Sequence, residues 1–204
     1  MAQHVRTIKS RIGNIENIAQ ITRAMNAIAM TKVTRMKRRL AVDRPYVEEL
    51  DDYIAQLVGR MTADVEPHPL MAPNGSDALG VLVLNSDRGL CGRYKGEINR
   101  RGDELLVQAQ PDAELLAGGE KARVHYVRRG IEPLASYSHV YDKPTTETAR
   151  WMANDLMDLY RKGRVGRIVV VYMQFLSDLK QSLVVEEFLP VSTEAKANDM
   201  LVEP

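Results

Sequence analysis

The chain has 204 residues, of which 45% are hydrophobic and 27% charged, values typical of a soluble protein with room for a helical arm and one compact domain. No stretch approaches 18 consecutive apolar residues and the N-terminus lacks an apolar signal core, so neither a membrane-spanning helix nor a targeting segment is expected. Cys91 is the single cysteine, which excludes an internal disulfide, disfavours a cysteine-based metal site and fits a reducing cytosolic compartment.

The net charge of +1 conceals an uneven distribution of charged residues. Residues 1–44 hold ten Lys and Arg against two acidic residues, whereas residues 45–66 hold six acidic residues against Arg60. Basic segments of this kind meet nucleic acid, anionic lipid or an acidic protein surface, and a solvated helix face explains them equally well. Nucleic acid is disfavoured because stacking aromatic residues are missing nearby. Five of the cations form the basic stripe: Lys32, Arg35, Lys37, Arg38 and Arg39.

The first predicted element is a long helical arm over residues 1–62. Its apolar residues recur at steps of three and four, which places them on one helix face. A stripe this narrow cannot bury itself, so the arm is expected to lie against another helix or inside another protein. Pro45 is expected either to kink the helix or to begin a new one, with Asp43 as its cap. The apolar seam comprises Val5, Ile8, Ile12, Ile15, Ile18, Ile21, Met25 and Ile28.

Residues 63–77 are rich in proline and predict a linker, after which strands and helices alternate. The strands are expected at 78–84, 113–117, 139–141, 167–172 and 182–190, and the helices at 96–109, 119–129 and 145–161. The apolar residues Trp151, Met152, Leu156, Leu159 and Tyr160 make the last helix amphipathic. This alternation predicts an α/β domain over residues 78–193 with a mostly parallel sheet and helices on both faces. A C-terminal segment, 194–204, follows it.

Catalytic patterns are weak in this sequence. The loop after the first predicted strand, residues 85–92, fits neither G-x-G-x-x-G nor the phosphate-binding P-loop, and the Asp87 carboxylate would repel a phosphate. Cys91 could be a nucleophile at a strand-to-helix turn, but a small residue in a tight glycine-flanked turn explains it better. The residues therefore favour a non-enzymatic protein without a cofactor. No metal-ligand spacing is present among His4, His68, His125 and His139.

Several segments resemble, in one consistent order over residues 3–204, the gamma subunit of F-type ATP synthases. They are Ile8-Lys9-Ser10-Arg11-Ile12, Asn17, Ile21-Thr22-Arg23-Ala24-Met25, Ala29 to Lys32, Arg44-Pro45-Tyr46, Ser86-Asp87-Arg88-Gly89-Leu90-Cys91-Gly92, Phe175, Ser177, Gln181 and Phe188-Leu189-Pro190. The resemblance implies a central rotor shaft, in which two long helices form an antiparallel coiled coil inside a ring of alternating alpha and beta subunits. A Rossmann-like domain would form the foot on the membrane ring of c subunits and bind the epsilon subunit.

On this resemblance, rotation of the c-ring driven by protons is coupled to ATP synthesis or hydrolysis on the beta subunits, and the chain itself is non-catalytic. It would be peripheral on the cytoplasmic face of the bacterial cell membrane or an equivalent energy-coupling membrane. The resemblance also implies that Met25 couples rotation to catalysis, that the basic stripe faces acidic loops of the beta subunits, and that loop 86–92 approaches them. The expected contact residues are Met25, Lys32, Arg35, Lys37, Arg38, Arg39, Asp87, Arg88 and Cys91.

The family continues after a segment like residues 201–204 into a second long helix. The chain is therefore expected to be a fragment, a truncation or a shaft completed by another polypeptide. Two interpretations of other classes stay open beside the rotor: a stand-alone helical adaptor with an α/β head, and a small α/β enzyme.

Overall fold

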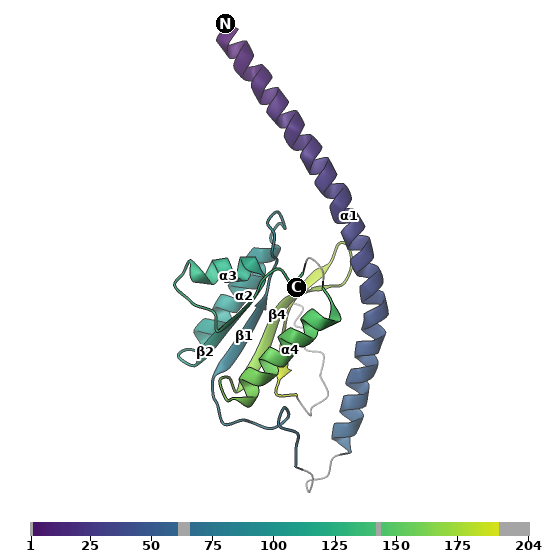
Figure 1. The fold of residues 1–204 in the computed structure, drawn as a ribbon, viewed down its shortest axis with the longest axis vertical. Coiled ribbons are helices and arrows are strands. Elements are labelled where there is room, and N and C mark those ends of the chain that lie inside the picture. The colour runs from purple at the N-terminus through teal and green to yellow at the C-terminus, as the bar shows by residue number, and fades with distance from the viewer. Residues whose placement is uncertain (1, 61–65, 142–143, 192–204) are drawn as a thin grey trace. The chain divides into compact units, whose positions relative to one another are not determined.

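The computed structural model describes residues 2–60, 66–141 and 144–191 and divides into two compact units, Met1–Arg60 and Met61–Pro204. The expected C-terminal segment 194–204 and residues 63–65 of the expected linker lie outside the described residues. Figure 1 shows that the first unit is one long helix and that the second is an α/β domain.

The first unit consists of α1 (Ala2–Gly59), a helix of 58 residues that is about 87 Å long at 1.5 Å per residue. It continues through Pro45, so the expectation of a new helix capped by Asp43 is wrong. Asp43 instead forms an ion pair with Arg39 one turn earlier, with Nε and Oδ2 3.6 Å apart. A second pair one turn apart joins Arg44 to Glu48 at 3.3 Å, so side-chain pairs support the helix on both sides of the proline.

The second unit contains five strands and three α-helices in its described part. In chain order they are β1 (Leu79–Leu84), α2 (Tyr94–Gln108), β2 (Ala113–Gly118), α3 (Glu120–Val127), β3 (Ala135–Tyr137), α4 (Thr146–Arg161), β4 (Arg167–Phe175) and β5 (Gln181–Leu189). The strand order is β3-β2-β1-β4-β5, in which the first four strands are parallel and β5 is antiparallel to β4. The expected mostly parallel sheet is therefore confirmed.

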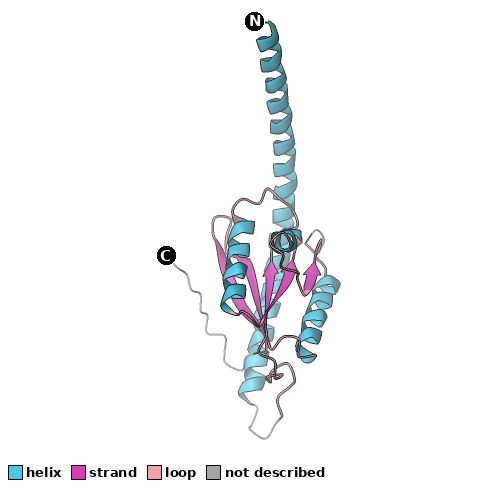
Figure 2. Ribbon diagram, turned by 90° about the vertical axis from the view of Figure 1, so that its left-hand side faces the viewer, coloured by secondary structure: helices cyan, strands magenta, loops and turns pink. Residues whose placement is uncertain are grey.

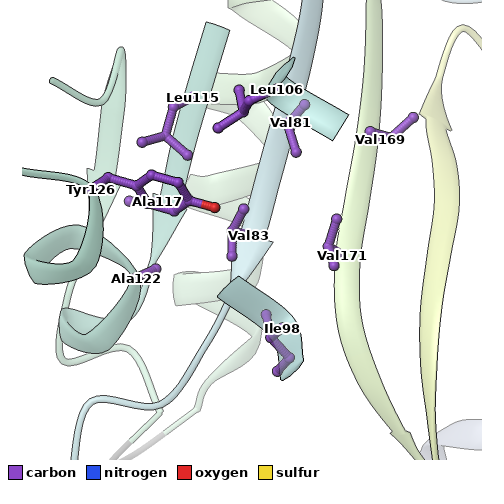
Figure 3. Close-up of a cluster of buried hydrophobic side chains, with 10 residues drawn as sticks. All are labelled: Val81, Val83, Ile98, Leu106, Leu115, Ala117, Ala122, Tyr126, Val169 and Val171. Carbon is purple, nitrogen blue, oxygen red and sulfur yellow. The ribbon is translucent and has the colours of Figure 1, made fainter. Parts of the chain in front are cut away.

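Helices cover both faces of this sheet, as Figure 2 shows. On one face, α2 and α3 pack over Val81 and Val83 of β1, and Figure 3 shows the Tyr126 ring of α3 reaching across the strands toward Val83. On the other face, Leu156 and Tyr160 of α4 pack in a second cluster. Alternate residues of β1 thus enter two different cores, which explains why the strand is a continuous apolar run in the sequence.

Two sequence expectations for this domain are corrected. The third strand lies at Ala135–Tyr137 and not at 139–141, because His139 has a φ of 62° and its N–H is bonded to the Asp87 carboxylate. A left-handed residue of this kind interrupts an extended strand. Trp151, expected on the apolar face of its helix, is 54% exposed and touches the Tyr137 ring edge-on at 5.3 Å.

The chain enters and leaves the α/β domain at neighbouring points. The N–H of Val191, two residues after β5, donates to the carbonyl of Leu70 at 2.8 Å. The side-chain amide of Asn74 donates to the carbonyl of Val165 at 2.8 Å, and the Tyr160 hydroxyl donates to the carbonyl of Ala72 at 2.7 Å. These bonds attach residues 70–76 to the end of the domain at which β4 begins.

Gly102 provides the first test of this packing. A Cβ atom at this position of α2 would lie 2.3 Å from the Tyr126 hydroxyl and 2.7 Å from Cγ2 of Val83, and both of those residues are fully buried. We expect Gly102→Ala to destabilise the domain by about 1–3 kcal/mol through overpacking. Urea unfolding followed by the fluorescence of Trp151, the single tryptophan, measures this change.

Gly96→Ala is the matched control for Gly102→Ala. Gly96 is in the same helix, but its Cβ would meet no atom within 4 Å. The gain in helix propensity should then leave stability unchanged or raise it by up to about 1 kcal/mol. Equal effects of the two substitutions would contradict the packing argument.

Candidate functional site

The apolar seam on α1 is uncovered within the first unit. Its eight members are between 47% and 65% exposed, with Met25 the least and Ile15 the most exposed. A row of large apolar side chains this open is far from the half-buried stripe of an ordinary surface helix. The seam is therefore a surface that is complete only against a partner.

The basic stripe follows the seam along α1 but does not form a single face. Lys32, Arg35 and Arg39 are spaced by three and four residues and share one side of the helix, and Met25 lies two turns before Lys32 on that side. Lys37 and Arg38 project at other angles around the helix axis. The side chains of Arg35, Arg38 and Arg39 are exposed, whereas Lys32 and Lys37 are half-buried. The cations thus wrap around the helix and present positive charge in several directions.

Asp87, in the loop after β1, is directed into the α/β domain. Its Oδ1 accepts hydrogen bonds from the N–H of Glu120, the first residue of α3, and from the N–H of His139, both at 2.9 Å. The carboxylate therefore caps the α3 N-terminus and joins the connections that follow β1, β2 and β3. Asp87 was expected at a partner contact, and the structure adds that its Oδ1 is bound within the domain.

The base of this loop is held by buried amides that sequence reasoning missed. The Asn85 side chain donates to Oδ1 of Asn99 at 2.7 Å and to the carbonyl of Lys95 at 3.0 Å, which ties the end of β1 to α2. Lys121 donates its N–H to the carbonyl of Ser86 at 2.9 Å. Gly119, with a φ of 89°, allows the start of α3 to lie close to the end of β1, because a Cβ at position 119 would lie 2.1 Å from the Asn85 carbonyl oxygen. The sequence signal for this contact was an asparagine directly after an apolar strand, because a buried amide needs hydrogen-bond partners.

The tip of the loop is exposed and has a defined conformation. Leu90 has a φ of 64° and is 89% exposed, an unusual combination for a leucine. The Ser86 hydroxyl donates to the carbonyl of Arg88 at 3.0 Å, and the exposed Cys91 thiol approaches the same carbonyl at 3.5 Å. Of the expected contact residues in this loop, Arg88 and Cys91 are therefore displayed on the surface and Asp87 supports them.

Glu120 carries the strongest ionic contacts beside this loop. Its carboxylate accepts hydrogen bonds from the Arg123 guanidinium at 2.7 and 2.9 Å and from the Ser138 hydroxyl at 3.2 Å. The bonds from Arg123, followed by the one from Ser138, lower the pKa of Glu120 to about 2. An acidic side chain in the first turn also suits the positive end of the α3 dipole.

The carboxylates of Asp87 and Glu120 at the N-terminus of α3 disfavour the alternative that this domain binds a nucleotide. Phosphates bind where backbone N–H groups at a helix N-terminus are open to a ligand. At α3, the Asp87 carboxylate already accepts from the Glu120 N–H and the Glu120 carboxylate adds negative charge, so this helix end disfavours a phosphate.

Among the described residues, no cluster of three or more His, Cys, Asp or Glu side chains could hold a metal ion. The helices in the described part of the chain include none with an apolar stretch that could span a lipid bilayer.

Replacing Asp87 tests its role as an internal tie. We expect Asp87→Ala to lower the free energy of unfolding by about 1–2 kcal/mol, because two backbone donors lose their acceptor. Asp87→Asn keeps one acceptor oxygen and should be clearly less destabilising. Urea unfolding monitored by Trp151 fluorescence compares the three proteins. Equal losses for alanine and asparagine would show that the hydrogen bonds do not carry the effect.

Comparison with known proteins identifies the family. The family model described as ATP synthase matches residues 4–204. The ATP synthase gamma chain of Moorella thermoacetica is 32% identical over 96% of this chain and 69% of its own length, and that of Desulfitobacterium hafniense is 31% identical over 91% and 66%. The fold is similar to a chain of the Tetrahymena thermophila mitochondrial ATP synthase central stalk and c-ring, with a TM-score of 0.66, 21% identity, and coverage of 83% of this chain and 72% of that one. Because the sequence match spans nearly the whole chain, the chain belongs to the family of ATP synthase gamma chains.

Proposed function

We propose that this chain is the central rotor shaft of an F-type ATP synthase. In this role, rotation of the membrane c-ring turns α1 inside the catalytic ring of alpha and beta subunits, and ATP is made or hydrolysed on the beta subunits. The observation that carries the proposal is the apolar seam, 47–65% exposed along a helix of 58 residues, in a chain of the gamma family. A seam of this kind requires a partner of matching length.

The charge on α1 suits a contact that is made and remade during rotation. Coulomb attraction depends weakly on direction, so cations that wrap around a helix can face acidic loops of successive beta subunits without one fixed geometry. Arg35 and Arg38 point away from the axis at different angles, which supports such a role. The chain would then act as a non-catalytic subunit.

The α/β domain is proposed as the foot of the shaft. It would rest on the c-ring and bind the epsilon subunit, at the cytoplasmic face of a bacterial or equivalent energy-coupling membrane. The Asp87 tie and the buried Asn85–Asn99 pair support a rigid body of this kind, because they connect the sheet to two helices. Rigidity suits an element that transmits torque.

Reconstitution tests the proposal directly. Purified alpha and beta subunits are assembled with and without this chain, and the products are examined by native mass spectrometry and by ATPase rate. We expect one copy of the chain per ring and stimulated, cooperative hydrolysis. Nucleotide binding by the chain alone without assembly would instead support an enzyme, and absence of both would support an adaptor.

Met25→Lys is the sharpest substitution on α1. Met25 is uncharged and flexible, which suits a contact that is broken and formed again at each step of rotation. A lysine there would form a new ionic contact with the ring, so we expect assembly to persist and coupling to fall. Proton pumping at a given ATPase rate, measured in membrane vesicles, reports coupling. Wild-type pumping at an unchanged ATPase rate would contradict the proposed role of Met25.

Met30→Lys is the matched control for Met25→Lys. Met30 is 60% exposed against 47% for Met25, and five residues of helix place it about 140° around the axis from Met25. The same change of charge there should leave coupling closer to that of the wild type. Equal losses at both positions would assign the effect to net charge and not to the seam.

A further inference from the structure

A repeat of seven residues runs along the whole of α1. Every seventh residue from Val5 to Ile54, and every seventh residue from Ile8 to Leu57, form two neighbouring rows on the helix, the heptad rows. A straight helix drifts away from a strict seven-residue repeat, so a repeat this long stays on one face only when two helices wind around each other. All but three positions of the heptad rows are apolar, and the exceptions are Thr22, Asn26 and Asp43.

Most of this surface is open to solvent. Nine large apolar side chains of the heptad rows are between 41% and 67% exposed, whereas Met36 and Ile54 are half-buried. The rows extend from Val5 to Leu57, about 80 Å at 1.5 Å per residue, and α1 is uninterrupted over this length (Figure 1). A partner that covers the rows must therefore supply a helix of about the same length.

A second copy of α1 matches the heptad rows in the antiparallel direction. When Val5 of one copy lies opposite Leu57 of the other, each residue of one row faces a residue of the other row along the whole helix. Ile12 then faces Leu50, and these side chains are 50% and 44% exposed in the single chain. Because a two-fold axis repeats each contact, large apolar side chains meet at both ends of the pair.

Charged residues beside the rows are complementary in this register. Lys9 of one copy faces Asp51 of the other, and Glu16 faces Arg44. Arg44 also contacts Glu48 of its own helix at 3.3 Å, and a guanidinium has enough donors for two carboxylates. All four residues of the two pairs are exposed in the single chain, so forming the pairs costs little desolvation.

The same register gives partners to the two tyrosines of α1. Tyr53 faces Arg11 of the other copy, an arrangement that permits a cation–π contact, and Tyr46 faces Ile18. Tyr53 and Tyr46 are 56% and 69% exposed in the single chain. Pairing would therefore remove the apolar parts of both rings from water.

The parallel direction is disfavoured by charge. A parallel pair would place Asp43 beside its own copy within the apolar layers, and Lys32 beside Lys37. In the antiparallel pair Asp43 faces Ala19, and like charges meet near the centre, where Arg23 faces Lys37. Because residues 1–44 are basic and residues 45–66 acidic, only the antiparallel direction places opposite charges together at the two ends.

We propose that a second copy of this chain covers the heptad rows, in an antiparallel two-helix coil that forms when the chain is outside the catalytic ring. Val5, Ile8, Ile12 and Ile15 belong both to the heptad rows and to the apolar seam. Self-association and entry into the ring therefore exclude each other, and the free chain is held as a dimer. The dimer requires no other subunit, so it does not depend on the rotor role.

Light scattering of the purified chain at micromolar concentration tests the association. We expect a mass twice that of the 23.0 kDa chain. A monomer under these conditions would overturn the inference and leave the surface to a different protein. A dimer that persists in the variant Ile12→Asp/Leu50→Asp would be held by other surfaces and would also overturn it.

Disulfide trapping tests the direction of the pair. In a Cys91→Ser background, we expect an oxidised mixture of Ile12→Cys and Leu50→Cys chains to form a disulfide between the two variants. Each variant alone should form none, whereas a disulfide within Ile12→Cys would indicate a parallel pair and overturn the register. The matched control is Asp52→Cys in place of Leu50→Cys, because position 52 lies about 200° around the helix axis from position 50. We expect no disulfide from that control.

Exchange of charge tests the register itself. Lys9→Glu turns two attractive pairs into two repulsive ones, so we expect it to raise the dimer dissociation constant about tenfold. Adding Asp51→Lys restores opposite charges at both sites and should bring the dissociation constant back toward that of the wild type. A double variant as weak as Lys9→Glu alone would show that these residues do not face each other.

Discussion

The Asp87 carboxylate is the interaction on which the organisation of the α/β domain depends. Two N–H groups, from Glu120 and His139, converge on one of its oxygens, so this one side chain contacts the connections after β1, β2 and β3. The same contact caps α3, fixes the base of loop 86–92 and occupies a position that would otherwise attract an anion. The strand ends of the α/β domain are thereby joined into one body.

Sequence patterns predicted the α/β architecture because the strands that supply both cores, such as Val81–Leu82–Val83, are continuous apolar runs in the sequence. They failed where tertiary contacts decide local conformation. The third strand was misplaced because the His139 N–H bonds to Asp87 across 52 positions of sequence, a contact that no local pattern contains. The start of a new helix at Pro45 was likewise predicted wrongly, because α1 continues through the proline.

The candidate site likewise contains features that the sequence predicts and features that only the structure shows. The exposed seam could be predicted from the spacing of its apolar residues, because the chain leaves it uncovered. The basic stripe could be predicted from charge alone, but not that two of its members, Lys32 and Lys37, are half-buried. The inward orientation of Asp87, the buried Asn85–Asn99 pair and the exposure of Leu90 could not be predicted, since each follows from the position of a strand end in the assembled sheet. The exposed face of a long helix can thus be predicted from its sequence, whereas the contacts of a connection at the end of a strand depend on the folded sheet.

The hydrogen bond between Leu70 and Val191 has a consequence for how the chain can be built and altered. A domain whose incoming and outgoing segments meet side by side behaves as a closed insert, because its interior can change without changing the separation of the two flanking segments. Residues between these two positions form a cassette. A substitution inside this segment can therefore alter the domain without moving Leu70 and Val191 apart.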